Sequence, residues 1–313
     1  MDKISRRQFN SALIAAGASA LAWQADTASA QAPRVKFPTQ PRERISVASW
    51  PFRMFIDAPA NRSAPKAPAH GMDLTEFPAM VVKRFGVHNI EPLDEHFHST
   101  DSAYVQKLKA ATEKAGCRVV DVPCAIRASF YDPDAAQRQL AVENGKKWIG
   151  IAAQLGSPSI RAHIQGARDA APDVTLTAES LKRLADYGAS KNVIVTLEND
   201  DNRTEDPFFL VQVIEKVANP YLRALPDFCN SMMTHDQEFN NRAMHALFRH
   251  AYNIVHMKDS EGDKGVFHTV DVAKCFEIAK AEGYHGYFSM EWEGDGEPYA
   301  GTQRLIDETL KYL

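Results

Sequence analysis

The stretch Val193-Ile-Val-Thr-Leu-Glu198 is a short apolar run that ends on a carboxylate, a pattern typical of a buried strand with a polar C-terminal end. Three other runs share this form, namely Leu222-Arg-Ala-Leu-Pro-Asp227, Asn253-Ile-Val-His256 and Tyr287-Phe-Ser-Met-Glu291. Their last residues follow one another at intervals of 29, 29 and 35 residues, the length of one strand plus one crossover helix in a (β/α)8 barrel. We therefore expect the four polar residues at the C-terminal rim, where such barrels hold their active sites.

The rest of the chain fits the same architecture. Apolar runs predict eight strands, at residues 45–50, 88–92, 118–123, 158–163, 193–198, 222–227, 254–258 and 286–291. Between them, stretches such as Thr177–Gly188 and Val270–Gly283 predict helices that close on glycine, the first opening on its threonine. An open doubly wound sheet would also explain the alternation. Only a closed α/β barrel, however, brings the polar ends of the seventh and eighth units to those of the fifth and sixth.

Residues 1–32 are expected to be a cleavable leader, which leaves residues 33–313 as one barrel domain. Ser5-Arg6-Arg7-Gln8-Phe9 precedes a weakly apolar run, and Thr27-Ala-Ser-Ala30-Gln-Ala32 is a small-residue cleavage signal. The paired arginines predict a twin-arginine signal that exports the folded protein to the periplasm, with an ordinary secretory peptide as the alternative. The apolar run is shorter than the roughly 20 residues that cross a bilayer, so no membrane partner is expected after cleavage.

Composition agrees with a globular domain, because 44% of the residues are apolar. The formal net charge of -4 becomes -5 when the leader, with three basic and two acidic residues, is removed, which argues against nucleic acid as a partner. The cysteines lack metal-type spacing and are expected to be buried free thiols; they are Cys117, Cys124, Cys229 and Cys275. A stretch rich in proline and alanine, residues 56–69, predicts a long rim loop or lid.

The strand ends resemble those of a known family. Val195-Thr-Leu-Glu198-Asn199, Pro226-Asp227, Val255-His256-Met-Lys258-Asp259 and Ser289-Met-Glu291 are similar to motifs of the xylose isomerase-like TIM barrels. This group includes sugar phosphate isomerases and epimerases, ketose 3-epimerases, inosose dehydratases and the AP endonuclease family. The resemblance covers residues 45–313, and its most diagnostic piece is His256-x-Lys258-Asp259 followed one unit later by Glu291.

The resemblance implies a metal site and a pair of catalytic carboxylates. Glu198, Asp227, His256 and Glu291 would bind one Mn, Co, Mg or Zn ion, and in the family's epimerases the two glutamates also form the acid/base pair. Independently of the family, three carboxylates and an imidazole are a suitable ligand set for a divalent ion. Such an ion stabilises the enediolate that forms when the carbon next to a carbonyl loses its proton. Lys258 could polarise the substrate oxygen, or could simply pair with Asp259 or Glu291.

The sequence departs from the epimerase pattern at two places. An amide, Asn230, stands where family epimerases usually place a histidine three residues after the metal aspartate. Asp263-Lys264-Gly265 occupies the place of an arginine that follows the metal histidine. These changes weaken the expectation of ketose 3-epimerase activity. Because the histidine is also a ligand in multi-zinc DNA-repair members, they argue against DNA cleavage.

Other polar and aromatic residues near the predicted strand ends are candidate substrate contacts. These candidates are Arg161, His163, Trp50, Glu91, Arg203 and Asn230. Arg161 and His163 could bind hydroxyls or form a structural ion pair. Glu91 could instead orient a neighbour, and Glu205 joins Arg203 as a possible reader of distal hydroxyls. Phe52 is expected in the core more often than against a sugar face. His96 and His98 resemble a metal pair, but their alternate spacing on a loop without a third ligand predicts a surface location.

Two classes of function remain open at this point. The first is a metal-dependent isomerase or epimerase that abstracts a proton next to the carbonyl of an unphosphorylated sugar or keto-sugar. The same chemistry on a keto-glycoside would expel a leaving group, which would make the protein a lyase. The second class is a non-catalytic periplasmic sugar-binding protein. The acid/base pair around a metal site favours the enzyme, because a binding protein does not need it.

Overall fold

Parallel strands at the eight predicted runs form a barrel within residues 32–62, 71–201, 203–263 and 265–313, the parts of the chain that the computed structural model describes. The strands are β1 (Ile45–Ala48), β2 (Asn89–Glu91), β3 (Arg118–Val119) with β4 (Pro123–Ala125), β5 (Ser159–His163), β6 (Ile194–Glu198), β7 (Leu222–Leu225), β8 (Ile254–Met257) and β11 (Tyr287–Met290). One sheet has the order β3-β2-β1-β11-β8, and the other has the order β4-β5-β6-β7. Strand β11, the last strand of the barrel, pairs with β1, the first.

Two seams connect these sheets into a ring. At the first seam, β3 and β4 belong to one interrupted segment that pairs with β2 on one side and β5 on the other. At the second seam, Asp227 and His256 form an isolated parallel bridge between the β7 and β8 segments. There the backbone N–H of His256 donates to the carbonyl of Pro226 at 3.0 Å, and that of Phe228 donates to the carbonyl of His256 at 3.2 Å. The predicted closed barrel is thereby confirmed, and the open doubly wound sheet is excluded.

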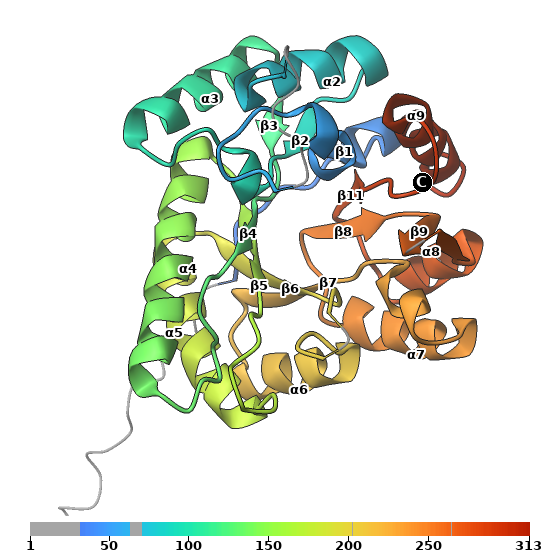
Figure 1. Ribbon diagram of the computed structural model, residues 1–313. Helices are drawn as coiled ribbons and strands as arrows, with labels where there is room; N and C mark the ends of the chain where they lie inside the picture. Colours follow the sequence, from blue (N-terminus) through green and yellow to red (C-terminus); the bar gives the residue numbers. More distant parts are fainter. Residues whose placement is uncertain (1–31, 63–70, 202, 264) are drawn as a thin grey trace, which may run out of the picture. The chain divides into compact units, whose positions relative to one another are not determined.

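Helices surround the strands (Figure 1). They are α2 (Phe77–Phe85), α3 (Ser102–Lys114), α4 (Ala135–Leu155), α5 (Val174–Lys191), α6 (Pro207–Val217), α7 (Gln237–Phe248), α8 (Val272–Ala281) and α9 (Pro298–Thr309). Short 3-10 turns are η1 (Pro41–Arg44), η2 (Trp50–Phe55), η3 (Leu74–Glu76), η4 (Asp94–His96) and η5 (Asn230–Met233). Because helices cover the outer face of the strands, both faces are buried, and the strands read as continuous apolar runs rather than alternating ones.

The helix expected at Thr177–Gly188 has different ends. Helix α5 begins at Val174, where the side chain of Asp173 caps it, and ends at Lys191, where Asn192 adopts a left-handed conformation with φ of 54°. Gly188 lies inside this helix, and a Cβ at this position would overlap the carbonyl oxygen of Val193. This glycine therefore permits close packing of the helix and does not terminate it. The other example, Val270–Gly283, is confirmed: α8 is capped by Asp271 and followed by Gly283 at φ of 72°.

An antiparallel hairpin, β9 (Ser260–Asp263) and β10 (Val266–Thr269), follows β8 and was not expected from the sequence.

The predicted 56–69 loop lies partly outside the described residues. Its described flanks are held together, because Ile56 bridges Met72 and the N–H of Met72 donates to the carbonyl of Phe55 at 2.7 Å.

The remaining global expectations have different outcomes. All four cysteines are buried and free, as predicted. Among the described residues, no helix is long and apolar enough to span a bilayer. The predicted leader lies outside the described residues apart from its last position, so the twin-arginine signal, its cleavage and the periplasmic address stay predictions.

Candidate active site

The four predicted metal ligands converge at one end of the barrel. Glu198 is the last residue of β6, Asp227 follows β7, His256 lies in β8 and Glu291 follows β11. One ligand atom from each residue lies within 4.8 Å of the others, and all four residues are buried. His256 Nδ1 is 2.6 Å from Glu198 Oε1 and 3.2 Å from Glu291 Oε2. The four strand ends therefore form one cluster, as the spacing along the chain predicts.

Asp227 shows that this cluster suits a cation. Its Oδ1 accepts the backbone N–H groups of Cys229 at 2.8 Å and Asn230 at 2.7 Å, which fix the carboxylate. Its Oδ2 is buried and accepts no hydrogen bond from the described residues, although the Lys258 ammonium is 3.5 Å away. Burial raises the pKa of Asp227 well above its usual range despite Lys258. Ionisation of this carboxyl therefore requires more positive charge, and a divalent ion at the cluster would supply it.

Glu91 contacts His256 and does not line the cavity above the cluster. The prediction of a substrate contact for Glu91 is therefore wrong, and its position fits the alternative of a group that orients a neighbour. Its Oε1 is 2.8 Å from His256 Nε2, and both side chains have no exposed surface. Histidine ligands commonly use their second ring nitrogen in this way, because the carboxylate fixes the orientation of the ring and its tautomer. Glu91 is therefore placed to direct Nδ1 of His256 toward the other ligands.

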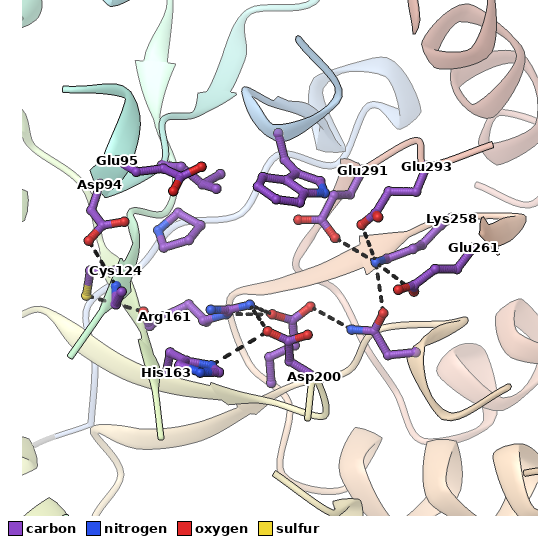
Figure 2. Close-up of a pocket in the computed structure, with 16 residues that line it drawn as sticks. Asp94, Glu95, Cys124, Arg161, His163, Asp200, Lys258, Glu261, Glu291 and Glu293 are labelled. Carbon is purple, nitrogen blue, oxygen red and sulfur yellow. Dashed lines mark hydrogen bonds and ion pairs between the residues drawn. The ribbon is translucent and has the colours of Figure 1, made fainter. Parts of the chain in front are cut away.

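Lys258 is enclosed by oxygen atoms. Its Nζ lies 3.1 Å from Glu291 Oε2, 2.9 Å from Glu293 Oε1 and 3.2 Å from Glu261 Oε2. It also donates to Asn230 Oδ1 at 2.8 Å. Figure 2 shows this ammonium among Glu261, Glu291 and Glu293. Of the two ion-pair partners predicted for Lys258, the structure shows Glu291. The other, Asp259, pairs with Arg304 instead.

Arg161 binds the opposite side of the cluster. Its Nε donates to Glu198 Oε2 at 2.5 Å, and its second guanidinium nitrogen is 2.9 Å from Asp200 Oδ2. Next to it, His163 Nδ1 lies 2.9 Å from Glu205 Oε2. Glu205 is buried and also accepts the N–H of Ile164 at 2.7 Å, so it holds His163 instead of reaching distal hydroxyls. Arg161 and His163 both line the pocket, in ion pairs that leave room for a substrate contact.

The charges around the cluster keep both glutamates ionised. Burial alone would raise the pKa of Glu198, but Arg161 and His256 outweigh it and lower that pKa to about 2. Burial also opposes ionisation of Glu291, and His256 with Lys258 outweighs it, so the pKa of Glu291 is lowered. At neutral pH both side chains are therefore carboxylates, which is the form that binds a metal ion or accepts a proton.

A cavity of about 270 Å³ opens above the cluster. Predicted residues that line it are Trp50, Arg161, His163, Glu198, Asn230, Lys258 and Glu291. The guanidinium of Arg53 stacks on the indole ring of Trp50, 4.3 Å from the ring centroid, and this contact orients the indole at the rim. Asn230 reaches Glu198 Oε1 at 3.4 Å, so the amide that replaces the family's histidine still faces the site.

Several other candidates lie outside this cavity. Arg203 lines a separate cavity beside Tyr131, and Phe52 is fully buried in the core as expected. His98 is exposed as predicted, but His96 is buried, with Nδ1 2.7 Å from Ser49 Oγ. The surface expectation for His96 is therefore wrong, because His96 ends the η4 turn and is buried together with the following Phe97.

Sequence reasoning missed five acidic residues in the cavity wall, namely Asp94, Glu95, Asp200, Glu261 and Glu293. Asp200 and Glu293 follow Glu198 and Glu291 by two positions. Because side chains alternate along extended chain, that spacing could have indicated a shared side. Asp94 and Glu95 lie in the η4 turn, on the side of the pocket away from Lys258 and Glu293 (Figure 2), and no periodic signal marks them.

Comparisons with known proteins agree with the geometry. The family described as xylose isomerase-like TIM barrel matches residues 80–313. A solved xylose isomerase-like TIM barrel protein from Mycobacterium smegmatis, in complex with magnesium, is 16% identical with a TM-score of 0.63, and the match covers 86% of this chain and 97% of that chain. D-allulose 3-epimerase from Methylomonas sp. is 15% identical with a TM-score of 0.66, covering 89% and 100%.

A third similar structure is 3-keto-D-glucoside 4-epimerase from E. coli, at 17% identity and a TM-score of 0.61, covering 86% of this chain and 99% of that chain. No curated protein sequence matches the chain significantly. At these identities the solved structures establish a shared fold, and the family match extends over most of the described barrel. The chain therefore belongs to the xylose isomerase-like TIM barrel family.

Proposed function

We propose that this protein is a divalent-metal-dependent sugar isomerase or epimerase that abstracts a proton next to the carbonyl of an unphosphorylated sugar or keto-sugar. The observation that carries the proposal is the convergence of Glu198, Asp227, His256 and Glu291, with Asp227 Oδ2 buried and without a hydrogen bond from the described residues. The nearest cation to that oxygen among the described residues is the Lys258 ammonium at 3.5 Å, so the oxygen has a lone pair left for an ion. The family match and the epimerases among the similar folds support the same chemistry.

Glu198 and Glu291 are the candidate proton acceptors and donors. They come from β6 and β11, which are not neighbours in the barrel, so a sugar in the pocket can meet a carboxylate from two directions. One carboxylate removes a proton from the substrate carbon, and the other returns one to it. The low pKa of Glu198 makes it a weak base, so abstraction depends on making the substrate carbon more acidic.

A divalent ion held by the four ligands would supply that acidification, because its charge stabilises the negative charge that develops on the substrate oxygens. Lys258 adds a fixed positive charge beside Glu291 and can donate to a substrate oxygen. Asn230 bonds to Lys258 and contacts Glu198, so it links both sides of the site. Arg161 holds Glu198 in place from the opposite wall.

The charge of the pocket favours an unphosphorylated substrate. Of the cations that line it, Arg161 already pairs with Glu198 and Asp200, and Lys258 already pairs with Glu261, Glu291 and Glu293. Asp94 and Glu95 add further negative charge to the wall. A phosphate would therefore meet repulsion rather than a free cation. Neutral hydroxyls, in contrast, can donate to these carboxylates.

Metal analysis of the purified protein followed by incubation with sugars in deuterated water tests the proposal. We expect one divalent ion per chain and solvent deuterium at the carbon next to the carbonyl of a ketose or keto-glycoside. Loss of a glycosidic group instead of exchange would assign the lyase reaction. Thermal stabilisation by sugars without exchange or product would indicate a binding protein, and a clear preference for phosphosugars would overturn the substrate assignment.

We also propose that the mature protein acts in the periplasm after twin-arginine export. The support is the sequence of residues 1–32, with Arg6 and Arg7 ahead of the apolar run and the small residues near Ala30. Export in the folded state would allow the cytosol to load a chosen ion before tighter-binding periplasmic metals compete.

A further inference from the structure

A second cavity, of about 350 Å³, adjoins the cavity above the four candidate metal ligands, which we call the metal pocket. The two cavities share three lining residues, Asp94, Glu95 and Ala125, so they meet at the η4 turn and the end of β4. The N–H of Ala125 donates to Asp94 Oδ2 at 3.0 Å, which fixes this boundary. In Figure 2, Asp94 and Glu95 mark that side of the metal pocket. The second cavity therefore extends the first, away from Lys258 and Glu293.

The far part of the second cavity carries hydrogen-bond donors with N–H groups left for a ligand. Arg127 and Asn144 line it, and neither side chain makes a hydrogen bond to another described residue. Lys147, which also lines it, donates to the neutral hydroxyl of Thr100 at 2.8 Å. The near part presents the carboxylates of Asp94 and Glu95.

Donors and acceptors thus face one space, and this combination suits hydroxyl groups, which both donate and accept. A simple anion would gain from Arg127 and Lys147 but would be repelled by Asp94 and Glu95. An apolar group would take water from Arg127, Asn144 and Glu95 without offering them a hydrogen bond, which is costly. The lining therefore favours a neutral, hydroxyl-rich group.

We propose that the second cavity is a sugar subsite, which binds the second ring of a disaccharide-like substrate while the ring that carries the carbonyl lies in the metal pocket. This inference rests on the proposed function, and it narrows the substrate from a free ketose to a glycoside. The metal pocket alone, at about 270 Å³, is slightly smaller than the roughly 300–1,000 Å³ typical of ligand sites, whereas the two cavities together fall well within that range. A free monosaccharide in the metal pocket would not reach Arg127 and Asn144, which line only the second cavity.

Binding measurements on the metal-loaded protein test the subsite separately from turnover. The probes are the keto forms of maltose and cellobiose, compared by calorimetry with the keto forms of methyl α- and β-glucoside. We expect one keto-disaccharide to bind roughly tenfold more tightly than the matched methyl glycoside, which one or two additional hydrogen bonds would provide. Asn144→Phe should fill the cavity and reduce this advantage to about twofold or less, leaving methyl glycoside affinity unchanged.

Two variants control for misfolding and for loss of volume. Asn144→Ala keeps the cavity open but removes one donor, so it should retain part of the preference for the disaccharide, and more of it than Asn144→Phe. Arg127→Ala alters an exposed side chain and should weaken only the disaccharide, by severalfold. Equal affinity for each disaccharide and its methyl glycoside, or a preference that survives Asn144→Phe, would overturn the subsite. Neither outcome would affect the proposed function, which the deuterium exchange test decides on its own.

Discussion

Glu91 Oε1 lies 2.8 Å from Nε2 of His256, and the other ring nitrogen of His256 lies 2.6 Å from Glu198. The imidazole is therefore held between a buried carboxylate and the candidate metal ligands. A carboxylate in this position makes a histidine ligand more basic and prevents it from rotating. Glu91 is thus expected to affect metal binding although it does not line the pocket.

We expect Glu91→Gln to weaken divalent metal affinity by roughly 10- to 100-fold, the range found when such supporting groups are replaced. Metal titration calorimetry on the apo protein measures the change. Glu205→Gln is a matched control, because Glu205 is also a buried carboxylate beside a histidine but contacts His163 instead of the cluster. Unchanged affinity in Glu91→Gln, or an equal loss in both variants, would contradict the role assigned to Glu91.

Asp227→Asn should remove most of the bound metal while preserving the local fold. The amide oxygen can still accept the N–H groups of Cys229 and Asn230, whereas the amide nitrogen that replaces Oδ2 cannot coordinate a cation. His256→Ala should show a similar loss of occupancy by elemental analysis. Asp200→Asn changes a pocket carboxylate outside the cluster and should retain the ion. Full metal content in both Asp227→Asn and His256→Ala would show that the site assignment is wrong.

Glu198→Gln and Glu291→Gln should each reduce turnover by about 10²- to 10⁴-fold, because each removes a general acid/base but keeps an oxygen for coordination. Metal binding should weaken less than turnover. For an epimerase, the two variants should lose opposite half-reactions, visible as deuterium exchange from one substrate epimer and not from the other. The two-base mechanism would fail if both variants exchanged both epimers at the same residual rate.

Protonation of His96 should oppose folding at acidic pH. Burial is the main cause that lowers the pKa of His96, to about 3 from an unfolded value of 6.5, and the nearby Arg53 adds to it. Between these two pKa values, His96 is protonated in the unfolded chain but neutral in the folded chain. The free energy of unfolding therefore falls as the pH falls, by about 1.4 kcal/mol per pH unit.

Denaturant titrations of the wild type and of His96→Asn between pH 6.5 and 5 measure this contribution. The variant amide can still accept a hydrogen bond from Ser49, and its stability should depend less steeply on pH. His98→Asn is the control, because it makes the same substitution at an exposed histidine two residues away. Identical slopes for the wild type and His96→Asn would rule out this source of acid sensitivity.

Replacing both Arg6 and Arg7 by lysine should retain the precursor in the cytosol, because the twin-arginine route requires the arginine pair. Cell fractionation with detection of the mature chain measures the distribution. Exchange of the exposed Lys36 for arginine in the mature chain is a matched control and should not affect export. Normal periplasmic accumulation of the double variant would favour the ordinary secretory peptide.

The metal ligands could be predicted from the sequence because barrel geometry converts spacing along the chain into position on the rim. Glu198, Asp227, His256 and Glu291 each end an apolar run one unit apart, so closure of the barrel places them together without knowledge of the intervening helices. The fold followed from the same pattern.

Other parts of the site depend on information that periodicity does not contain. Glu91 contacts His256 from a strand that is not its neighbour, so its role depends on the depth of both side chains in the barrel. Asp94 and Glu95 reach the cavity through a 3-10 turn, which has no strand or helix pattern. The sequence pattern predicts a helix end at Gly188, because glycine often follows a helix, whereas its packing against Val193 is a tertiary contact that the pattern does not contain.

The bridge between Asp227 and His256 has a consequence for how the barrel opens. These residues are both candidate metal ligands and the backbone seam between β7 and β8. An ion that ties the two side chains together also resists separation of the two sheets, so metal binding and local unfolding of this seam are thermodynamically linked. The amide hydrogens of Phe228 and His256, which bond across the seam, should then exchange with solvent more slowly in the metal-loaded protein than in the apo protein.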